Sequence, residues 1–336
     1  MRPVPAAALQ LMKRAHVATN VAFVTKREKE EISVPSHYGS DGEQSTSTAF
    51  KNIFKKFKRR VPPPDFSDVV DPTLANALKG IAVERLGTKD FQVSADDAEL
   101  LGLKPIEEWR ITTIKGREGL YILPSIIREE AHLKWLQRCF QYAETPNITN
   151  LTAHDNTPKT DFLRSAAKSL RWTTLGVDYN WTTKEYPLEG RPLPIELKRL
   201  ATIVCDAIGV GKMEADAAIV NYYPPKSTLS PHQDRSERDL TRALVSVSFG
   251  QSAVYLTGGT SLDDPILPIW LHSGDVLVMH ADQRLVYHAV PCIVSTRKFD
   301  GATNKGKAEE NVEEDKELLD YANTSRVNIT IRQVNE

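Results

Sequence analysis

Residues 221–234 read NYYPPKSTLSPHQD and begin within a β-rich run, ADAAIVNYY, that ends at Tyr223. His232 and Asp234 lie one residue apart, so on an extended strand both side chains project from the same face. The distant His288 could complete a set of three ligands. Two imidazoles and one carboxylate suit a non-haem Fe(II) centre that keeps coordination positions open for a co-substrate and O2. The pattern indicates an oxygen-activating iron enzyme.

Short β-rich runs separated by turn sequences dominate the chain from residue 216 onward. They are ADAAIVNYY (215–223), RALVSVSFGQSAVYL (242–256), PIWLHSGDVLVM (268–279), RLVYHAV (284–290) and RVNITIRQV (326–334). Antiparallel strands at this spacing predict a double-sheet jelly roll, also called a double-stranded β-helix. The apolar residues Leu197, Leu200 and Val204 predict a helix that ends at Gly209. We therefore expect an α+β protein with a mostly β catalytic core and flanking helices.

Changes in composition divide the chain into three parts. Residues 1–48 are expected to form a basic, flexible N-terminal segment and linker. Residues 49–165 are expected to be mainly helical and to include a basic amphipathic helix. Residues 166–336 are expected to form the jelly-roll core, in which the acidic stretch 300–320 is a surface loop with a short helix at EDKELLDYA.

The last run, RVNITIRQV, alternates polar and apolar residues. On a strand, Arg326, Asn328, Thr330 and Arg332 share one face, and the apolar residues between them share the other. Two arginines on one strand face are unremarkable if that face is solvated, but if it points into a barrel each charge is costly unless a carboxylate meets it. A small dicarboxylate ligand would satisfy both.

Together these motifs resemble the AlkB family of Fe(II)/2-oxoglutarate-dependent dioxygenases, which act on nucleic acids. The matching pieces are N-x-Y (221–223), HQD (232–234), SVSFGQSAVYLTGG (246–259), HSGDVLVM (272–279), RLVYHAVP (284–291) and R-x-N-x-T-x-R-Q (326–333). Further pieces, LGLKPIEEW (101–109) and RWTTLGVDYNW (171–181), are most similar to the AlkB homologue one branch. The resemblance covers about residues 45–336.

The resemblance implies that His232, Asp234 and His288 hold Fe(II), with 2-oxoglutarate and O2 as co-substrates. Oxidative decarboxylation of 2-oxoglutarate to succinate and CO2 would drive hydroxylation of a methyl carbon on a base. An N-hydroxymethyl product collapses to formaldehyde and the bare base, whereas a carbon methyl stops at an alcohol or aldehyde. His272 with Asp275 is an alternative metal pair, but a histidine beside a Ser-Gly-Asp turn more often bonds to the backbone.

The same resemblance assigns the residues that hold 2-oxoglutarate. Arg326 would anchor the distal carboxylate together with Tyr223 and Asn328. Asn221 and Arg332 would secure the ligand nearer the metal. Alternatively, Arg332 serves a carboxylate on the metal side, because the step from residue 326 to residue 332 spans roughly 20 Å of strand and the ligand is shorter.

Substrate recognition is expected from aromatic residues near the metal, because a target base must reach it unpaired or flipped. Trp172 and Tyr179 match positions in the family's nucleotide-recognition lid, and Trp181 lies next to them; ordinary packing is the alternative. The chain departs from the family at Val177, where the usual motif has a tyrosine, and at Leu262, where relatives often have an arginine. Candidate substrates are N-methyladenine in DNA or tRNA and methylcytosine in tRNA.

A basic amphipathic helix is predicted just after residue 48. Phe50, Ile53, Phe54 and Phe57 recur at helical spacing, and Pro62 to Pro64 end the helix. Six cations lie within 51–60, and four of them, Lys55, Lys56, Lys58 and Arg59, are candidate substrate-binding residues. Such a face could contact phosphates, attract anionic lipid, or remain in water while the phenylalanines dock on the core. We favour phosphate contact.

Cysteine usage and the length of apolar runs indicate the kind of compartment in which the protein works. The net charge is −1, the three cysteines (Cys139, Cys205 and Cys292) lie far apart, and no C-x-x-C motif is present. This indicates a reducing compartment rather than a disulfide framework or a zinc ribbon. No apolar run approaches the roughly 18 residues of a membrane span, so we expect no integral membrane association.

Residues 1–27 are basic and contain no acid, which is compatible with a mitochondrial presequence, but they lack serine, which such peptides usually favour; a disordered basic tail is the preferred interpretation. We expect a monomer in the nucleus, the mitochondrion or the cytoplasm. Two other functions fit less well, namely a protein hydroxylase or lysine demethylase on the same fold and a catalytically idle nucleic-acid-binding adaptor. The basic helix argues against the first, and the complete ligand set argues against the second.

Overall fold

The computed structural model describes residues 47–74, 81–85, 91–152, 158–300 and 316–335. These residues all belong to one compact unit. Most of the basic segment expected over 1–48, including the candidate presequence, lies outside the described residues. No helix within the described ranges is long and apolar enough to cross a membrane.

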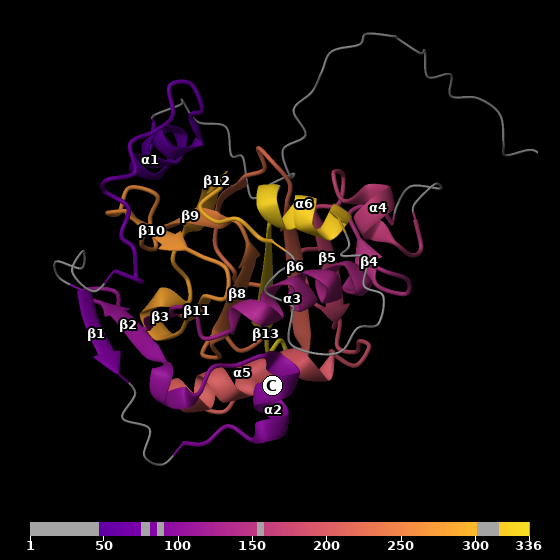
Figure 1. The fold of residues 1–336 in the computed structure, drawn as a ribbon. Helices are drawn as coiled ribbons and strands as arrows, with labels where there is room; N and C mark the ends of the chain where they lie inside the picture. Colours follow the sequence, from indigo (N-terminus) through magenta and orange to yellow (C-terminus); the bar gives the residue numbers. More distant parts are fainter. Residues whose placement is uncertain (1–46, 75–80, 86–90, 153–157, 301–315, 336) are drawn as a thin grey trace, which may run out of the picture. The chain divides into compact units, whose positions relative to one another are not determined.

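The larger of two antiparallel sheets has nine strands in the order β1-β2-β3-β11-β8-β13-β6-β5-β4 (Figure 1). They are β1 (Ile81–Arg85), β2 (Arg110–Ile114), β3 (Leu120–Leu123), β4 (Ile148–Thr149), β5 (Trp172–Gly176), β6 (Ala217–Tyr223), β8 (Leu244–Gly250), β11 (Val276–Met279) and β13 (Arg326–Arg332). The C-terminal strand β13 lies inside the sheet, with Arg326 opposite Tyr223 of β6 and Gly250 of β8. This position buries its backbone on both sides.

The smaller sheet has four strands in the order β10-β9-β12-β7. They are β7 (Leu229–His232), β9 (Ser252–Thr257), β10 (Leu267–Leu271) and β12 (His288–Val294). The pairing of β12 with β7 places His288 directly opposite His232. Two antiparallel sheets with this connectivity confirm the predicted jelly roll.

An apolar core joins the inner faces of the two sheets. It contains Leu244 and Leu277 from the larger sheet with Tyr255, Leu271 and Val290 from the smaller sheet. On β13 the alternation of side chains decides which face each residue takes. Val327, Ile329 and Ile331 join the core on the outer face of the larger sheet, so the polar residues between them face inward.

Helices cover the outer face of the larger sheet. The helices that contact its central strands β8 and β13 are α3 (Glu129–Tyr142), α5 (Ile195–Ile208) and α6 (Lys316–Thr324). The remaining short helices are α2 (Ala95–Leu101), η1 (Ile106–Glu108), α4 (Phe162–Ala166) and η2 (Ala281–Gln283). Gly209 ends α5 at φ 72°, a left-handed conformation that glycine adopts without steric cost. The predicted end of this helix is therefore confirmed.

The basic helix α1 (Ala49–Lys58) packs on the other side of the jelly roll, against β12 and β7 (Figure 1). Thr48 caps it, since its side chain accepts a hydrogen bond from the Lys51 N–H. Phe50 and Phe57 are buried against Val254 and Leu256 of β9. The predicted amphipathic helix and its docking face are confirmed.

The region 49–165 contributes more than helices. Strands β1 to β4 all come from it and extend the larger sheet. The expected division at residue 165 therefore falls between strands β4 and β5, which pair with each other. The sequence pattern did not indicate β4, because a strand as short as Ile148–Thr149 has no readable periodicity.

Candidate active site

Three predicted metal ligands meet between the two sheets. Metal-binding atoms of His232, Asp234 and His288 all lie within 4.8 Å of one another. His232 ends β7 and His288 begins β12, so the antiparallel pairing brings their rings to a centroid distance of 4.3 Å. Nε2 of His288 lies 3.6 Å from Oδ2 of Asp234. The spacing suits one small cation.

The backbone selects which nitrogen each histidine presents. Nδ1 of His232 lies 2.9 Å from the Ser230 carbonyl oxygen, and Nδ1 of His288 lies 3.2 Å from the Val286 carbonyl oxygen. A carbonyl oxygen only accepts hydrogen bonds, so both Nδ1 atoms carry the proton and leave Nε2 free to bind a metal. Burial and the nearby His232 lower the pKa of His288 to about 4, so the imidazole is neutral near pH 7, as a metal ligand must be.

Asp234 lies beyond the end of its strand, since β7 stops at His232. His232 is therefore the last residue of the paired strand, and Asp234 follows two residues later, outside the paired part of β7. Burial disfavours the charged form of Asp234, but Arg332, His288, His232 and Arg284 outweigh burial and hold the pKa of its carboxyl below the ordinary value. The carboxylate is ionised and ready to bind a cation.

Arg326 is a buried cation without a protein counter-charge. Its side chain is 1% exposed, and within the described ranges no carboxylate forms an ion pair with it. Nη2 donates to Ser248 Oγ at 2.9 Å, whereas Nε and Nη1 have no hydrogen-bond partner. The guanidinium lies 5.1 Å from the centre of the Tyr223 ring. The unsatisfied Nε–H and Nη1–H donors leave this guanidinium able to bind the carboxylate of a small ligand.

The other predicted 2-oxoglutarate residues lie around Arg326 on β6 and β13. Asn221 and Asn328 are directly opposite each other, one position from Tyr223 and Arg326 along each strand face. Asn328 donates to Ser246 Oγ at 2.7 Å and to the Val247 carbonyl at 3.0 Å. All four line one cavity of about 280 Å³, which also contains the three metal ligands.

Arg332 lines the same cavity but is already paired with protein carboxylates. Its Nη1 lies 2.7 Å from Oε1 of Glu237 and 3.5 Å from Oδ1 of Asp234. Burial opposes its charge, but Tyr186, Asp234 and Glu237 outweigh burial and raise its pKa. The geometry favours the metal-side role that was the alternative for this arginine.

Aromatic side chains line the cavity beside the metal ligands. The ring centroids of Trp172 and Trp181 are 4.6 Å apart, and those of Tyr179 and Trp181 are 4.9 Å apart. Trp181 is 41% exposed, so it lies where the cavity meets solvent. The three predicted aromatic residues are thus together, and Tyr186, which no sequence motif indicated, lies 5.0 Å from Tyr179.

The departures from the family pattern have structural explanations. Val177 is buried against Ile219 and the rings of Tyr179 and Tyr186. Leu262 packs in the cluster beneath α1, and its carbonyl accepts a hydrogen bond from Phe50 N–H at 2.9 Å. Leu262 therefore supports the basic helix and does not line the cavity.

The four candidate cations of α1 are exposed. Lys56 pairs with Asp68 at 3.1 Å, and Arg59 donates to the Val61 carbonyl. The helix end reaches the β6–β7 loop, where Arg60 Nη2 donates to the Lys226 carbonyl at 2.7 Å. That loop leads into β7 and the cavity-lining residues Leu229 and Ser230.

The alternative metal pair is engaged elsewhere. The His272 N–H donates to Oδ2 of Asp275 at 2.7 Å, and its Nδ1 lies 2.7 Å from Ser252 Oγ. Asp275 also accepts a hydrogen bond from the Ser125 N–H at 2.8 Å. The His272 imidazole thus bonds to the side chains of Ser252 and Asp71, with its Nε2 3.4 Å from Asp71 Oδ1, and not to the backbone as expected.

The model of the 2OG-Fe(II) oxygenase superfamily matches residues 119–332. The chain belongs to this superfamily. Within it, the chain is 32% identical to "Nucleic acid dioxygenase ALKBH1" of Mus musculus over 85% of its own length and 84% of the relative's. It is 30% identical to "tRNA demethylase abh1" of Schizosaccharomyces pombe, covering 87% of this chain and 98% of that one. It is 27% identical to "DNA N(6)-methyladenine demethylase ALKBH1A" of Arabidopsis thaliana, covering 85% and 96%. These matches confirm the AlkB family.

Membership of the 2OG-Fe(II) oxygenase superfamily implies Fe(II), 2-oxoglutarate and O2, and the residues present fit them. His232, Asp234 and His288 supply the two-histidine, one-carboxylate donor set that suits Fe(II). The unsatisfied donors of Arg326 fit a co-substrate carboxylate. Bound iron supplies the oxidising chemistry, while this chain's residues hold the metal and orient the co-substrate.

Two charged residues beside the site were not predicted as site residues, although Arg284 begins the quoted motif RLVYHAVP. Glu237 accepts from Arg332 and from Arg284, whose Nη2 lies 2.6 Å away. Both side chains are nearly inaccessible to solvent, at 1% and 2% exposure. Glu237 lies three residues after Asp234 in the sequence, which is the one clue to its position.

Proposed function

We propose that this dioxygenase oxidatively demethylates, or oxidises methyl groups on, bases in nucleic acid. The observation that carries the proposal is the aromatic group Trp172, Tyr179, Trp181 and Tyr186, which lines the same cavity as the metal ligands. Stacking on aromatic rings is the common way to hold a base taken out of its helix, and it tolerates different bases. The three relatives are named for nucleic acid, tRNA and DNA, respectively, which supports this substrate class.

The candidate substrates are N-methyladenine in DNA or tRNA and methylcytosine in tRNA. The decisive experiment incubates the full chain with Fe(II), 2-oxoglutarate and either total tRNA or genomic DNA, followed by mass spectrometry of the nucleosides. We expect one methylated nucleoside to fall in step with succinate release, with formaldehyde as a second product for an N-methyl group. Unchanged nucleosides in both pools alongside hydroxylation of a protein would support the protein hydroxylase instead.

The exposed cations of α1 are proposed to contact phosphates. Replacing Lys55, Lys56, Lys58 and Arg59 with glutamine should weaken binding of all nucleic acids and flatten the salt dependence of affinity. The log-log slope should fall by about 0.7 to 0.9 for each phosphate that is no longer neutralised. Turnover of 2-oxoglutarate without nucleic acid should hardly change, because these residues do not line the cavity.

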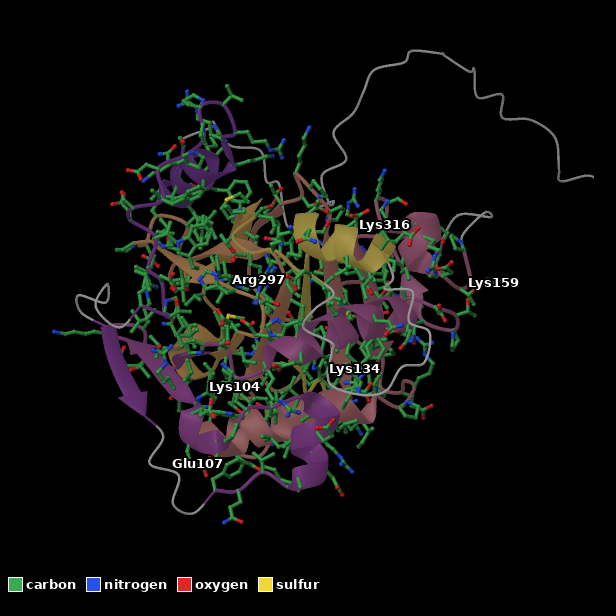
Figure 2. The ribbon with its side chains drawn as sticks, in the orientation of Figure 1. Lys104, Glu107, Lys134, Lys159, Arg297 and Lys316 are labelled. Carbon is green, nitrogen blue, oxygen red and sulfur yellow. The ribbon has the colours of Figure 1, made fainter. Side chains whose placement is uncertain are left out.

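A matched control for this variant removes four exposed lysines elsewhere, Lys134, Lys159, Lys198 and Lys316. Three of them are labelled in Figure 2, away from α1. This control has the same change of net charge and should leave the slope nearly unchanged. Equal slopes for the two variants would assign α1 to packing alone, through Phe50 and Phe57.

The partly exposed Trp181 is proposed to stack on the target base. Trp181→Ala should weaken binding of an unpaired methylated oligonucleotide by about 1–3 kcal/mol, the usual contribution of one base–aromatic stack. The measurement is fluorescence anisotropy with labelled single strands. Leu188→Ala is the control, because Leu188 is 76% exposed on the same segment and does not line the cavity. Similar losses in both variants would argue against stacking.

A further inference from the structure

Four charged side chains form a closed buried network on the far side of Asp234 from the two histidines. Glu237 accepts from Arg332 Nη1 at 2.7 Å and from Arg284 Nη2 at 2.6 Å. Arg332 Nη1 also reaches Oδ1 of Asp234 at 3.5 Å. Arg284 Nη1 donates to the main-chain carbonyl of Asp234. Both the carboxylate and the backbone of Asp234 are therefore tied to Glu237 through one arginine each.

The network is electrically balanced, with two arginines against two carboxylates. Buried ion pairs seldom add net stability, because desolvation offsets their attraction and apolar replacements are often as stable or more so. Stability alone therefore gives no reason to keep Glu237 and Arg284. Their contacts lead, directly or through Arg332, to the metal-binding residue Asp234. A role in holding this ligand would explain their presence where stability does not.

We propose that Glu237 and Arg284 are positioning residues of the metal centre, which hold Asp234 in the geometry that binds iron. Glu237 turns the Arg332 guanidinium toward the Asp234 carboxylate, and Arg284 fixes the main chain at Asp234, just after the end of β7. Arg284 is itself anchored, since its Nε donates to the Arg242 carbonyl at 3.1 Å. The network links the 233–243 segment, the segment before β12 and the end of β13.

The same network separates the roles of the two arginines on β13. Arg332 forms ion pairs with the carboxylates of Asp234 and Glu237, so its replacement should mainly affect metal binding. Arg326 has unsatisfied N–H donors, so its replacement should mainly affect binding of the co-substrate. The inference rests on the iron centre but not on the nucleic-acid substrate.

The test measures metal affinity directly in the full-length protein, with Co(II) as the probe and its visible absorption as the readout. Glu237→Gln should weaken Co(II) binding roughly 10- to 100-fold, the usual effect of losing a group that orients a metal ligand, and should alter the shape of the absorption bands. Asp216→Asn is the matched control. Asp216 also holds the end of β13, accepting from the N–H groups of Val334 and Asn335 at 2.7 and 3.1 Å, but it does not contact Asp234.

A second variant covers the case in which Glu237→Gln fails to fold. The double variant Glu237→Met with Arg284→Met removes one buried positive and one buried negative charge together and leaves Arg332 paired with Asp234, so the thermal midpoint should stay near the wild-type value, while Co(II) affinity should still fall at least tenfold. A folded double variant with the wild-type Co(II) affinity and spectrum would overturn the proposal. Failure of the wild-type protein to bind Co(II) in a manner that depends on Asp234 would instead overturn the metal assignment itself.

Discussion

Asp234→Ala should abolish Fe(II)-dependent turnover of 2-oxoglutarate and leave the fold intact. The variant removes the one anionic ligand of a three-residue site. Its loss of metal affinity should therefore exceed the roughly 10- to 100-fold typical of residues that only orient a ligand. Succinate release at saturating Fe(II) measures the activity. The fold should survive because Glu237 still compensates Arg332, at 2.7 Å.

The control for this variant is Asp282→Ala. Asp282 lies in η2, is exposed and does not line the cavity, so its loss should leave succinate release near the wild-type rate. Circular dichroism of both variants separates a lost ligand from a lost fold. Wild-type turnover by Asp234→Ala would rule out this metal centre.

Arg326→Lys should raise the KM for 2-oxoglutarate by roughly 30-fold or more, with little change in the Fe(II) requirement. A lysine offers a point charge where the arginine offers two parallel N–H donors. Disrupting a buried, hydrogen-bonded charge pair costs about 2–5 kcal/mol, and 2 kcal/mol already corresponds to about 30-fold. Succinate release at varied 2-oxoglutarate gives the KM.

Arg297→Lys provides the comparison for this second variant. Arg297 also pairs with a carboxylate, Glu129 at 2.9 Å, but that pair is partly exposed and outside the cavity. Its replacement should not alter the KM. Arg332→Lys should mainly raise the Fe(II) requirement. An unaltered 2-oxoglutarate KM in Arg326→Lys would show that the co-substrate carboxylate binds elsewhere.

Local patterns in the chain were sufficient to predict several elements. The alternation in RVNITIRQV predicted which β13 side chains share a face, because side chains on a strand alternate strictly, and the family resemblance assigned Arg326 and Arg332 to the co-substrate. Helical spacing and a terminal glycine predicted α5, and the phenylalanine spacing predicted the docked face of α1. The predicted metal ligands came from one local motif and a family resemblance at His288, and the structure brings them within 4.8 Å.

Other features depend on contacts between distant segments. Arg284 meets Glu237 across 47 residues and Arg332 meets it across 95, so no local period marks them. The short strands of 81–149 join the larger sheet through pairing with distant segments, as β3 does with β11.

The sequence by itself indicated the jelly-roll class, the His232–Asp234 pair and the residues that share each face of β13, since these patterns depend on neighbours within a few positions, and the family resemblance added His288. Only the tertiary structure showed that Arg332 pairs with carboxylates beside the metal site whereas Arg326 is left to bind the co-substrate. Glu237 and Asp234 compensate Arg332, whereas within the described ranges Arg326 has no carboxylate partner and keeps two nitrogens unsatisfied. The physical reason is that the cost of a buried charge depends on which groups surround it in space, and strand pairing brings those groups together from distant parts of the chain.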